Sequence, residues 1–349
     1  MAVLGVNNPN LLDLAKRTDP DGKIAQVVEL LMETNEILPD MSWVEGNLTT
    51  GHRTTVRTGI PEPTWRRMYQ FVQPSKSTTA QITDDTGMLE AYAEVDKALA
   101  DLNGNTAAFR LSEEMAFIEG MNQEVARTLF YGNSDLVPAS FTGLAPRFNE
   151  RNPAFAANAD NVIHAGGAST DNASIWLVVW GPNTVHGIVP KGSTAGLQVT
   201  DKGQVTLETG SGVGGTGGGR MEAYRTHYRW DVGLTVRDWR YVVRIANIGK
   251  STLSNVYTDG EFATGPNLPD LLFQAMRIVP NLSFGRPALY MSRDMATWLA
   301  RQKAAMGLNS YATAETVQGT MGWTENFMGI PIRRVDVLSA DEALVPSST

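Results

Sequence analysis

The residues with the clearest chemical potential are a run of glycines, "GSGVGGTGGG", at 210–219. Gly210, Gly212 and Gly215 satisfy the G-x-G-x-x-G pattern of a dinucleotide-binding turn. Such a turn must follow a strand and open a helix, because the pyrophosphate binds at the helix N-terminus. A strand-like "GQVTLET" precedes the glycines, but the "RMEAYRTHYRW" after them is also strand-like. We therefore interpret Gly210–Gly219 as a flexible loop between antiparallel strands, with nucleotide binding as the weaker alternative.

The other reactive residue types form no recognisable site. "IGKST" lacks the glycine that a P-loop needs at the position of Arg244, so we interpret it as a turn. The acidic pairs Asp84-Asp85 and Glu113-Glu114 are expected in the first turns of helices, where negative charge is favourable. The histidines are scattered without metal-ligand spacing; they are His52, His164, His186 and His227. The chain also lacks cysteine and G-x-S-x-G, so we predict no catalytic residue, cofactor or metal, and no enzymatic activity.

The composition is that of a folded protein that makes many protein contacts. The 349 residues are 42% hydrophobic and 19% charged, which allows one large domain or two to three smaller ones. A net charge of −8 argues against tight binding of duplex DNA, and 21 arginines against 8 lysines favour extensive protein interfaces. We expect no signal peptide, and no stretch reaches the ~20 apolar residues of a membrane span.

The first half of the chain is predicted to pair a polar hairpin with long helices. Residues 1–22 are expected to form an arm, followed by a helix at 24–38. Residues 41–83 are Thr-rich and β-prone with few large apolar side chains, so a hairpin there needs another surface to lie on. A helix is predicted after Thr83, over 84–104. A second helix at 106–131, roughly 39 Å long, carries an apolar stripe: Leu111, Met115, Ile118, Met121, Val125 and Leu129.

The second half is predicted to be mixed, with strands and two further helices. "IWLVVWG", "VHGIVPKG" and the alternating tract at about 222–248 are expected to be strands. "LPDLLFQAMRIVP" and "SRDMATWLARQKAAM" are expected to be helices, the second capped by Ser292. "RPALYMS" and "GIPIRRVDVL" complete the sheet. The fold class is therefore α+β.

Several segments, in this order, resemble the major capsid proteins of tailed phages with the Hong Kong 97 fold. "TGIPEPTWRRMY" resembles the return of the extended loop in short-tailed phages of the epsilon-fifteen type. "EVDKALADL", "LFYGN" and "FTGLAPRF" resemble the run through the spine helix. "WGPNTVHGIVPKG", "GLTVRDWRYVVRIANI" and "FMGIPIRRVDVL" resemble the later strands. Each motif alone is weak, but together they cover about residues 20–340.

The resemblance implies a division of the chain. Residues 1–40 would be an N-terminal arm, and 41–80 an extended loop that lies across a neighbouring subunit. The peripheral domain would comprise 81–150, with a spine helix at 106–131, and about 222–258. The axial domain would be formed mainly by 151–221 and 259–349.

The same resemblance implies a structural function and a set of partners. The protein would form pentamers and hexamers of an icosahedral shell that encloses double-stranded DNA without sequence-specific binding. A scaffolding protein, a portal and a decoration protein would be partners, and no membrane is implied. The protein would be located in the virion and assembled in the host bacterial cytoplasm. Lys76 could take part in the crosslinking seen in some members, but we expect the common state without it. An encapsulin-like nanocompartment shell remains an alternative.

The resemblance also directs attention to basic residues of the extended loop. Four arginines there are expected to contact acidic residues on neighbouring subunits: Arg53, Arg57, Arg66 and Arg67. The simpler reading of each is a solvated surface charge.

Overall fold

The computed structural model describes residues 9, 33, 35–168, 170–208, 219–258, 261–306, 313–317, 320–338 and 341–348. The expected arm at 1–22, most of the helix expected at 24–38, and the glycines at 210–218 lie outside these residues. The chain divides into two compact units, each described here by itself. Unit 1 comprises Met1–Glu33, Met88–Val125 and Thr194–Asp231. Unit 2 comprises Thr34–Gly87, Ala126–Ser193 and Val232–Thr349.

Unit 2 is built on a sheet whose central strand is buried along its whole length. All nine residues of β5 (Asn172–Trp180) are buried. β5 pairs antiparallel with β9 (Val242–Gly249) and with β12 (Arg286–Met291), and Leu177 lies opposite Val243 and Leu289. Strands buried on both faces are expected to be almost continuously apolar, as "IWLVVW" is. The further strands are β1 (Trp43–Glu45), β2 (Gly51–Gly59), β4 (Val162–His164), β6 (Val185–Val189), β10 (Tyr257–Thr258), β11 (Glu261–Phe262), β13 (Thr313–Val317), β14 (Thr320–Thr324), β15 (Asn326–Phe327) and β16 (Ile330–Arg334).

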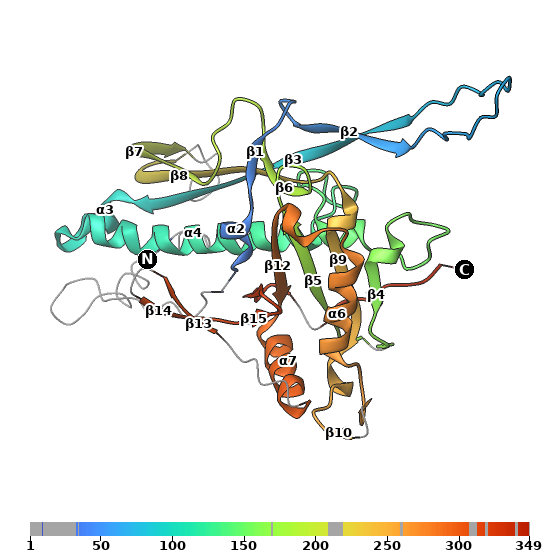
Figure 1. Ribbon diagram of the computed structural model, residues 1–349. Helices are drawn as coiled ribbons and strands as arrows, with labels where there is room; N and C mark the ends of the chain where they lie inside the picture. The colour runs from blue at the N-terminus through green and yellow to red at the C-terminus, as the bar shows by residue number, and fades with distance from the viewer. Residues whose placement is uncertain are drawn as a thin grey trace. The chain divides into compact units, whose positions relative to one another are not determined.

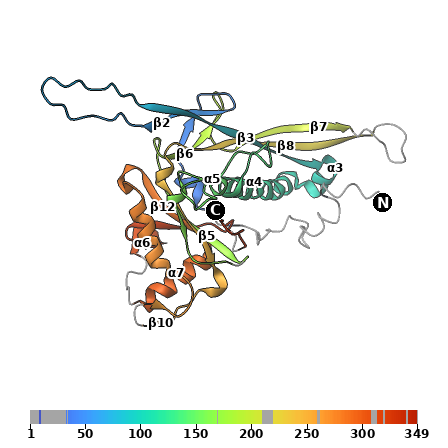
Figure 2. The ribbon, with the colours of Figure 1, turned by 90° about the vertical axis from the view of Figure 1, so that its right-hand side faces the viewer.

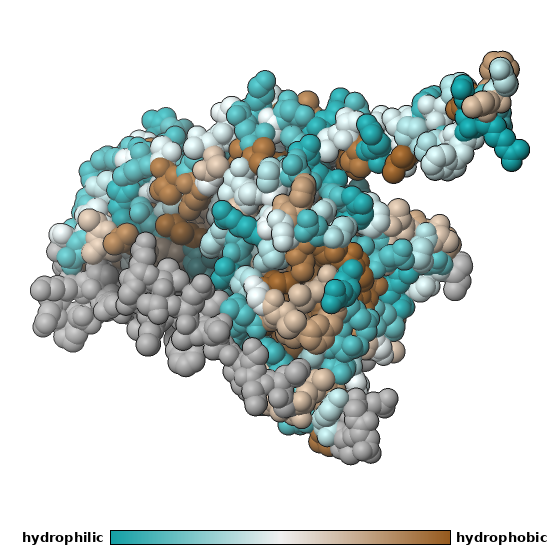
Figure 3. All heavy atoms as spheres, in the orientation of Figure 1, coloured by the Kyte–Doolittle hydropathy of each residue, from teal (hydrophilic) through white to brown (hydrophobic). Residues whose placement is uncertain are grey.

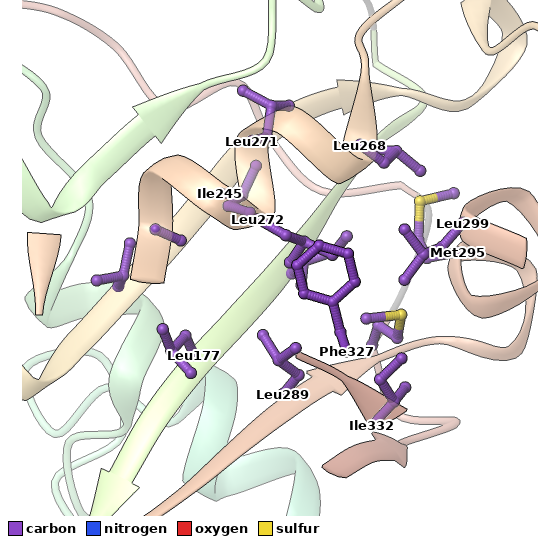
Figure 4. Close-up of a cluster of buried hydrophobic side chains, with 14 of the residues drawn as sticks. Leu177, Ile245, Leu268, Leu271, Leu272, Leu289, Met295, Leu299, Phe327 and Ile332 are labelled. Carbon is purple, nitrogen blue, oxygen red and sulfur yellow. The ribbon is translucent and has the colours of Figure 1, made fainter. Parts of the chain in front are cut away.

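Two helices pack on the strands of unit 2 and complete its main hydrophobic core. α6 (Leu268–Ile278) begins at an Asn267 cap, and α7 (Arg293–Ala305) begins at Ser292, whose Oγ accepts the Met295 amide at 3.3 Å. Figure 4 shows Leu272 and Leu299 from these helices converging with Phe327 above the strands. Both helices and the Ser292 cap confirm the sequence prediction. The short helices of this unit are α2 (Ile37–Asp40) and α5 (Leu144–Arg147).

Unit 1 consists of a β-ribbon packed on a long helix. β7 (Gln198–Glu208) pairs antiparallel with β8 (Arg220–Val236), and β3 (Thr78–Asp96) precedes the short helix α3 (Lys97–Ala100). α4 spans Thr106–Tyr131, the predicted bounds of the long helix. β3, α4 and β8 each contribute residues to both units. Inside unit 1, Met121 packs with Ala93 and Tyr228 in one small core, and Phe109 packs with Val95 in another.

The prediction of a helix at 84–104 is wrong, because residues 78–96 form the single strand β3. The spacing of its apolar residues fits both the helical repeat and the two-residue repeat of a strand. Leu89, Ala91, Ala93 and Val95 alternate with polar or amphipathic residues and lie toward the inside, which is the strand pattern. Pairing in the sheet overrides the helix propensity of its Ala, Glu and Leu residues. Thr83 therefore caps no helix, and Asp84 and Asp85 lie within the strand.

Two further expectations about α4 are corrected. Glu113 and Glu114 do not lie in a first turn, since the helix begins at Thr106; Glu114 instead accepts a hydrogen bond from the Thr226 hydroxyl at 2.8 Å. The predicted apolar stripe is buried only in its second half, at Met121, Val125 and Leu129. Its first half is 42–59% exposed at Leu111, Met115 and Ile118.

The mixed α+β class predicted from the sequence is confirmed, as are the predicted strands and the long β-rich tract. In the described part of the chain, no helix is long and apolar enough to cross a membrane.

Candidate inter-subunit surface

A hairpin formed by β2 and the start of β3 exposes most of its residues on unit 2. The strands pair antiparallel from Gly51 opposite Asp85 to Gly59 opposite Thr78. Figures 1 and 2 show the connecting segment extending beyond the paired strands, away from the sheet that holds β5 and β12. A polar two-stranded ribbon of this kind is marginal on its own in water. The hairpin therefore confirms the polar ribbon predicted within residues 41–83.

The end of this hairpin carries large apolar side chains with no cover. We call residues 60–72 the loop tip. Five of its side chains are 84–102% exposed: Ile60, Trp65, Met68, Tyr69 and Phe71. Figure 3 shows apolar residues at the far end of the hairpin, at the upper right. Isolated subunits rarely expose several large apolar residues together unless they form an interaction surface.

A turn organises the loop tip. The Gln70 amide donates to the Arg67 carbonyl at 3.2 Å, and the Arg67 amide donates to Gln70 Oε1 at 3.3 Å. Tyr69 has φ of +62°, in the left-handed region that non-glycine residues seldom adopt. These bonds fix where the turn falls, and the side chains of Met68 and Tyr69 lie at its corner.

The four arginines singled out in the sequence lie on the hairpin but are not brought together. Arg53 Nε donates to Thr83 Oγ1 at 3.3 Å across the ribbon, and the Arg53 amide donates to Asn47 Oδ1 at 2.7 Å. Arg57 lies further along β2, while Arg66 and Arg67 lie in the loop tip. All four are exposed, and no described acidic side chain lies within ion-pair distance of any of them. Their contact with a neighbour stays a prediction.

The apolar residues of the loop tip were missed by the sequence analysis, although the signal was present. Trp65, Met68, Tyr69 and Phe71 fall within seven residues of an otherwise polar segment. The average apolar content of residues 41–83 is low and hides this cluster. Clustering within a short window, rather than average content, was the informative property.

The glycine segment has strand neighbours on both sides. β7 and β8 pair from Gln198 opposite Arg229 to Glu208 opposite Arg220, next to the undescribed residues. The element after the glycines is therefore a strand, as predicted, and a helix N-terminus for a pyrophosphate does not follow them. Lys250 of "IGKST" begins a short 3₁₀ turn and bonds the carboxylate of Asp294, which fits the turn interpretation.

Two of the four histidines are neighbours, contrary to the expectation that all are scattered. The rings of His52 on β2 and His186 on β6 lie 5.8 Å apart, edge to face. Burial, the chief cause, and the charge of Arg237 lower the pKa of His52, and burial lowers that of His186 to about 4. The residues are 134 positions apart in the sequence, so spacing could not reveal the pair. No group of three or more potential metal ligands occurs among the described residues.

A buried ion pair fixes the C-terminal segment to the sheet of unit 2. Arg244 on β9 donates from Nη2 to Glu342 Oε2 at 2.7 Å and from Nη1 to the Phe148 carbonyl at 2.9 Å. The Tyr131 hydroxyl donates to Glu342 Oε1 at 2.7 Å, and the Ser174 hydroxyl donates to Oε2. The Arg244 guanidinium also lies 5.0 Å above the Trp176 ring. Because the guanidinium of Arg244 and both carboxylate oxygens of Glu342 are hydrogen-bonded, this cluster is structural.

Comparisons with known proteins agree on one class. A sequence profile of the major capsid protein GP7 matches residues 19–346. A near-atomic structure of bacteriophage Epsilon15 is 35% identical, covers 99% of this chain and 100% of its own, and superposes with a TM-score of 0.75. The capsid of bacteriophage JBD30 is 12% identical over 88% of this chain and 93% of its own, with a TM-score of 0.44, too low to carry an argument. No curated protein matches the chain.

Proposed function

From the premise that this chain belongs to the major capsid protein GP7 family and is a bacteriophage capsid shell protein with the Hong Kong 97-like fold, we propose how it builds that shell. The subunits assemble as pentamers and hexamers, and the extended loop, residues 41–80, lies across a neighbouring subunit. The shell encloses double-stranded DNA without sequence-specific contacts.

The observation that carries this proposal is the exposed loop tip. Trp65, Tyr69 and Phe71 are exposed over nearly all of their surface in the single subunit. Aromatic side chains contribute most when they are buried in an interface. A shell supplies a neighbour for every loop, so each tip is covered without any change within its own subunit. The exposed first half of the α4 stripe, at Leu111, Met115 and Ile118, is a second surface available for shell contacts.

The expected domains follow from the same premise. We assign 1–40 to an N-terminal arm, 81–150 and about 222–258 to a peripheral domain, and 151–221 and 259–349 mainly to an axial domain. The compact units place Thr194–Asp231 with Met88–Val125, a different division from these domains. The arginines of the extended loop, Arg53, Arg57, Arg66 and Arg67, contact acidic groups of neighbours around the apolar contact.

Partners beyond the chain itself are part of the proposal. A scaffolding protein guides assembly, a portal occupies one vertex, and a decoration protein can bind the outer face. Assembly takes place in the bacterial cytoplasm and the product is the virion. The net charge of −8 is consistent with DNA that is enclosed but not tightly bound.

The test is electron microscopy of the purified chain with light scattering. Closed particles, or rings of five and six, are expected for the wild type. The double variant W65S/F71S is expected to remain unassembled, whereas Phe155→Ser, at another exposed phenylalanine, is expected to assemble normally. Normal shells from the double variant would overturn the role of the loop tip. A wild type that stays monomeric with scaffold added would count against the shell proposal itself.

No observation favours the alternative of a nucleotide-binding enzyme, since strands flank the glycine segment on both sides. An encapsulin from Synechococcus elongatus is 11% identical with a TM-score of 0.37, too low to support the nanocompartment alternative.

A further inference from the structure

The root of the hairpin contains a buried polar cluster that the shell function does not use. At this root, Gly51 on β2 lies opposite Asp85, and His52 lies opposite Asp84. The strands approach so closely that a Cβ on Gly51 would lie 2.2 Å from the Asp84 carbonyl oxygen. The side chains of His52, Thr54 and Asp84 share one face of the ribbon because residues two apart, and paired residues, point the same way.

A second histidine faces this surface from the sheet of unit 2. His186 on β6 lies opposite Thr235 on β8, and its ring packs edge-to-face against His52 at 5.8 Å. Four members of the cluster are at most 5% exposed: Thr54, Asp84, His186 and Thr235. Strands from three parts of the chain therefore meet at one enclosed polar contact.

Several polar atoms in this contact have no hydrogen-bond partner among the described residues. They are His52 Nδ1, Thr54 Oγ1, Asp84 Oδ2, His186 Nδ1 and Nε2, and Thr235 Oγ1. The large majority of buried side-chain polar atoms in native proteins are hydrogen-bonded, so six unpaired atoms in one contact are unusual. Opening the contact would let water bond these atoms, so they do not stabilise the closed arrangement.

The Asp84 carboxylate raises the pKa of His52, but one of its two oxygens already pairs with a cation. Asp84 Oδ1 is already bonded to Arg147 Nη1 at 2.7 Å. Arg237 lowers the pKa of both histidines and donates from Nη1 to the Pro182 carbonyl at 2.9 Å. Burial, then the charges of His52 and Arg237, lower the pKa of His186 to about 4. The closed contact therefore favours the neutral form of His186.

We propose that this cluster is an acid-sensitive latch at the root of the extended loop, held closed by neutral His186 and released when His186 gains a proton. Release separates the β2–β3 ribbon from β6 and exposes the imidazolium to water. The latch lies within one subunit, so the inference does not rest on the proposed function.

The direction and size of the effect follow from linkage. A histidine whose pKa is lowered in the closed state stabilises that state at pH above its ordinary value of 6.5, and the stabilisation is lost as pH falls from 6.5 toward 4. With these two pKa values, the open fraction increases about 30-fold between pH 7.5 and pH 5.0.

The test is hydrogen–deuterium exchange of the full-length chain at pH 7.5 and pH 5.0, corrected for the intrinsic pH dependence of exchange. Light scattering at both pH values verifies an unchanged assembly state. The readout is exchange in residues 51–56 and 78–85 relative to β5. The wild type is expected to show a relative increase of about 30-fold at pH 5.0. The variant His186→Asn is expected to abolish the increase.

His227→Asn is the matched control, because His227 stacks on Tyr92 in unit 1, at 4.5 Å between rings. It is expected to retain the wild-type increase. If His186→Asn does not fold, the variant His52→Asn is measured instead. Because His186 remains in this variant, the increase in exchange at pH 5.0 is expected to persist. A flat wild-type response, an unchanged increase in His186→Asn, or a flat response in His52→Asn would each overturn the latch.

Discussion

The loop tip and the central strand β5 use the same kinds of side chain in opposite ways. Trp176 and Trp180 of β5 are fully buried among aromatic neighbours. The ring centres of Phe130 and Trp176 lie 6.2 Å apart, and those of Tyr290 and Trp180 lie 6.4 Å apart. Trp65 and Phe71 of the loop tip are almost fully exposed. Burial of one large apolar side chain stabilises by about 1.5–3 kcal/mol. The body therefore stabilises itself, whereas the tip gains this free energy only from a second surface.

Loss of the buried ion pair between Arg244 and Glu342 should destabilise the body most. Glu342→Ala leaves Arg244 buried and without its counter-ion, and we expect the free energy of unfolding to fall by about 3–5 kcal/mol. Urea denaturation of unassembled subunits measures it. Glu325→Ala is the control, because the partner of Glu325, Arg334, is half exposed and the loss should be small. A loss in Glu342→Ala no larger than in the control would contradict the structural role of the cluster.

A second experiment compares the removal of one buried side chain of the body with the removal of one exposed side chain of the loop tip. Leu272→Ala removes a fully buried side chain, and we expect a loss of about 2–5 kcal/mol in the free energy of unfolding. Trp65→Ala removes a larger side chain, yet we expect a change below about 0.5 kcal/mol, because nothing in the subunit covers it. Both values come from the same denaturation curves. Comparable losses in the two variants would show that the tip is packed within its own subunit.

The smallest expected effect concerns the charges beside the apolar tip. Arg66→Gln and Arg67→Gln remove exposed cations, and we expect assembly to require a few-fold higher protein concentration at low salt. Light scattering at increasing ionic strength measures the difference, which should shrink as salt screens the contact. Arg277→Gln, at an arginine on α6, supplies the control for loss of one positive charge. A salt-independent defect would argue against an electrostatic contact.

Most of the body could be predicted from the sequence, because local pattern and tertiary packing agree there. The bounds of α4, the Ser292 cap and the apolar run of β5 each point to one structure. The helix predicted over most of β3 was wrong because the spacing of its apolar residues fits both a helix and a strand. Pairing in the sheet decided between the two. Local propensity cannot supply that information.

The loop tip and the proposed latch were missed from the sequence for different reasons. Residues such as Trp65 were visible, but whether a tryptophan is covered depends on the fold around it. His52 and His186 are adjacent only because β2 and β6 meet in space. The four arginines were found on the hairpin as expected, yet an isolated subunit cannot reveal their partners.

The turn between Arg67 and Gln70 has a consequence for how quickly the loop tip can associate. Its two hydrogen bonds and the left-handed Tyr69 restrict the backbone before any partner arrives. Part of the conformational entropy that association would remove is therefore already absent in the free subunit. Encounters between subunits then need fewer rearrangements to become productive, so the rate of assembly should depend on this turn more than its small size suggests.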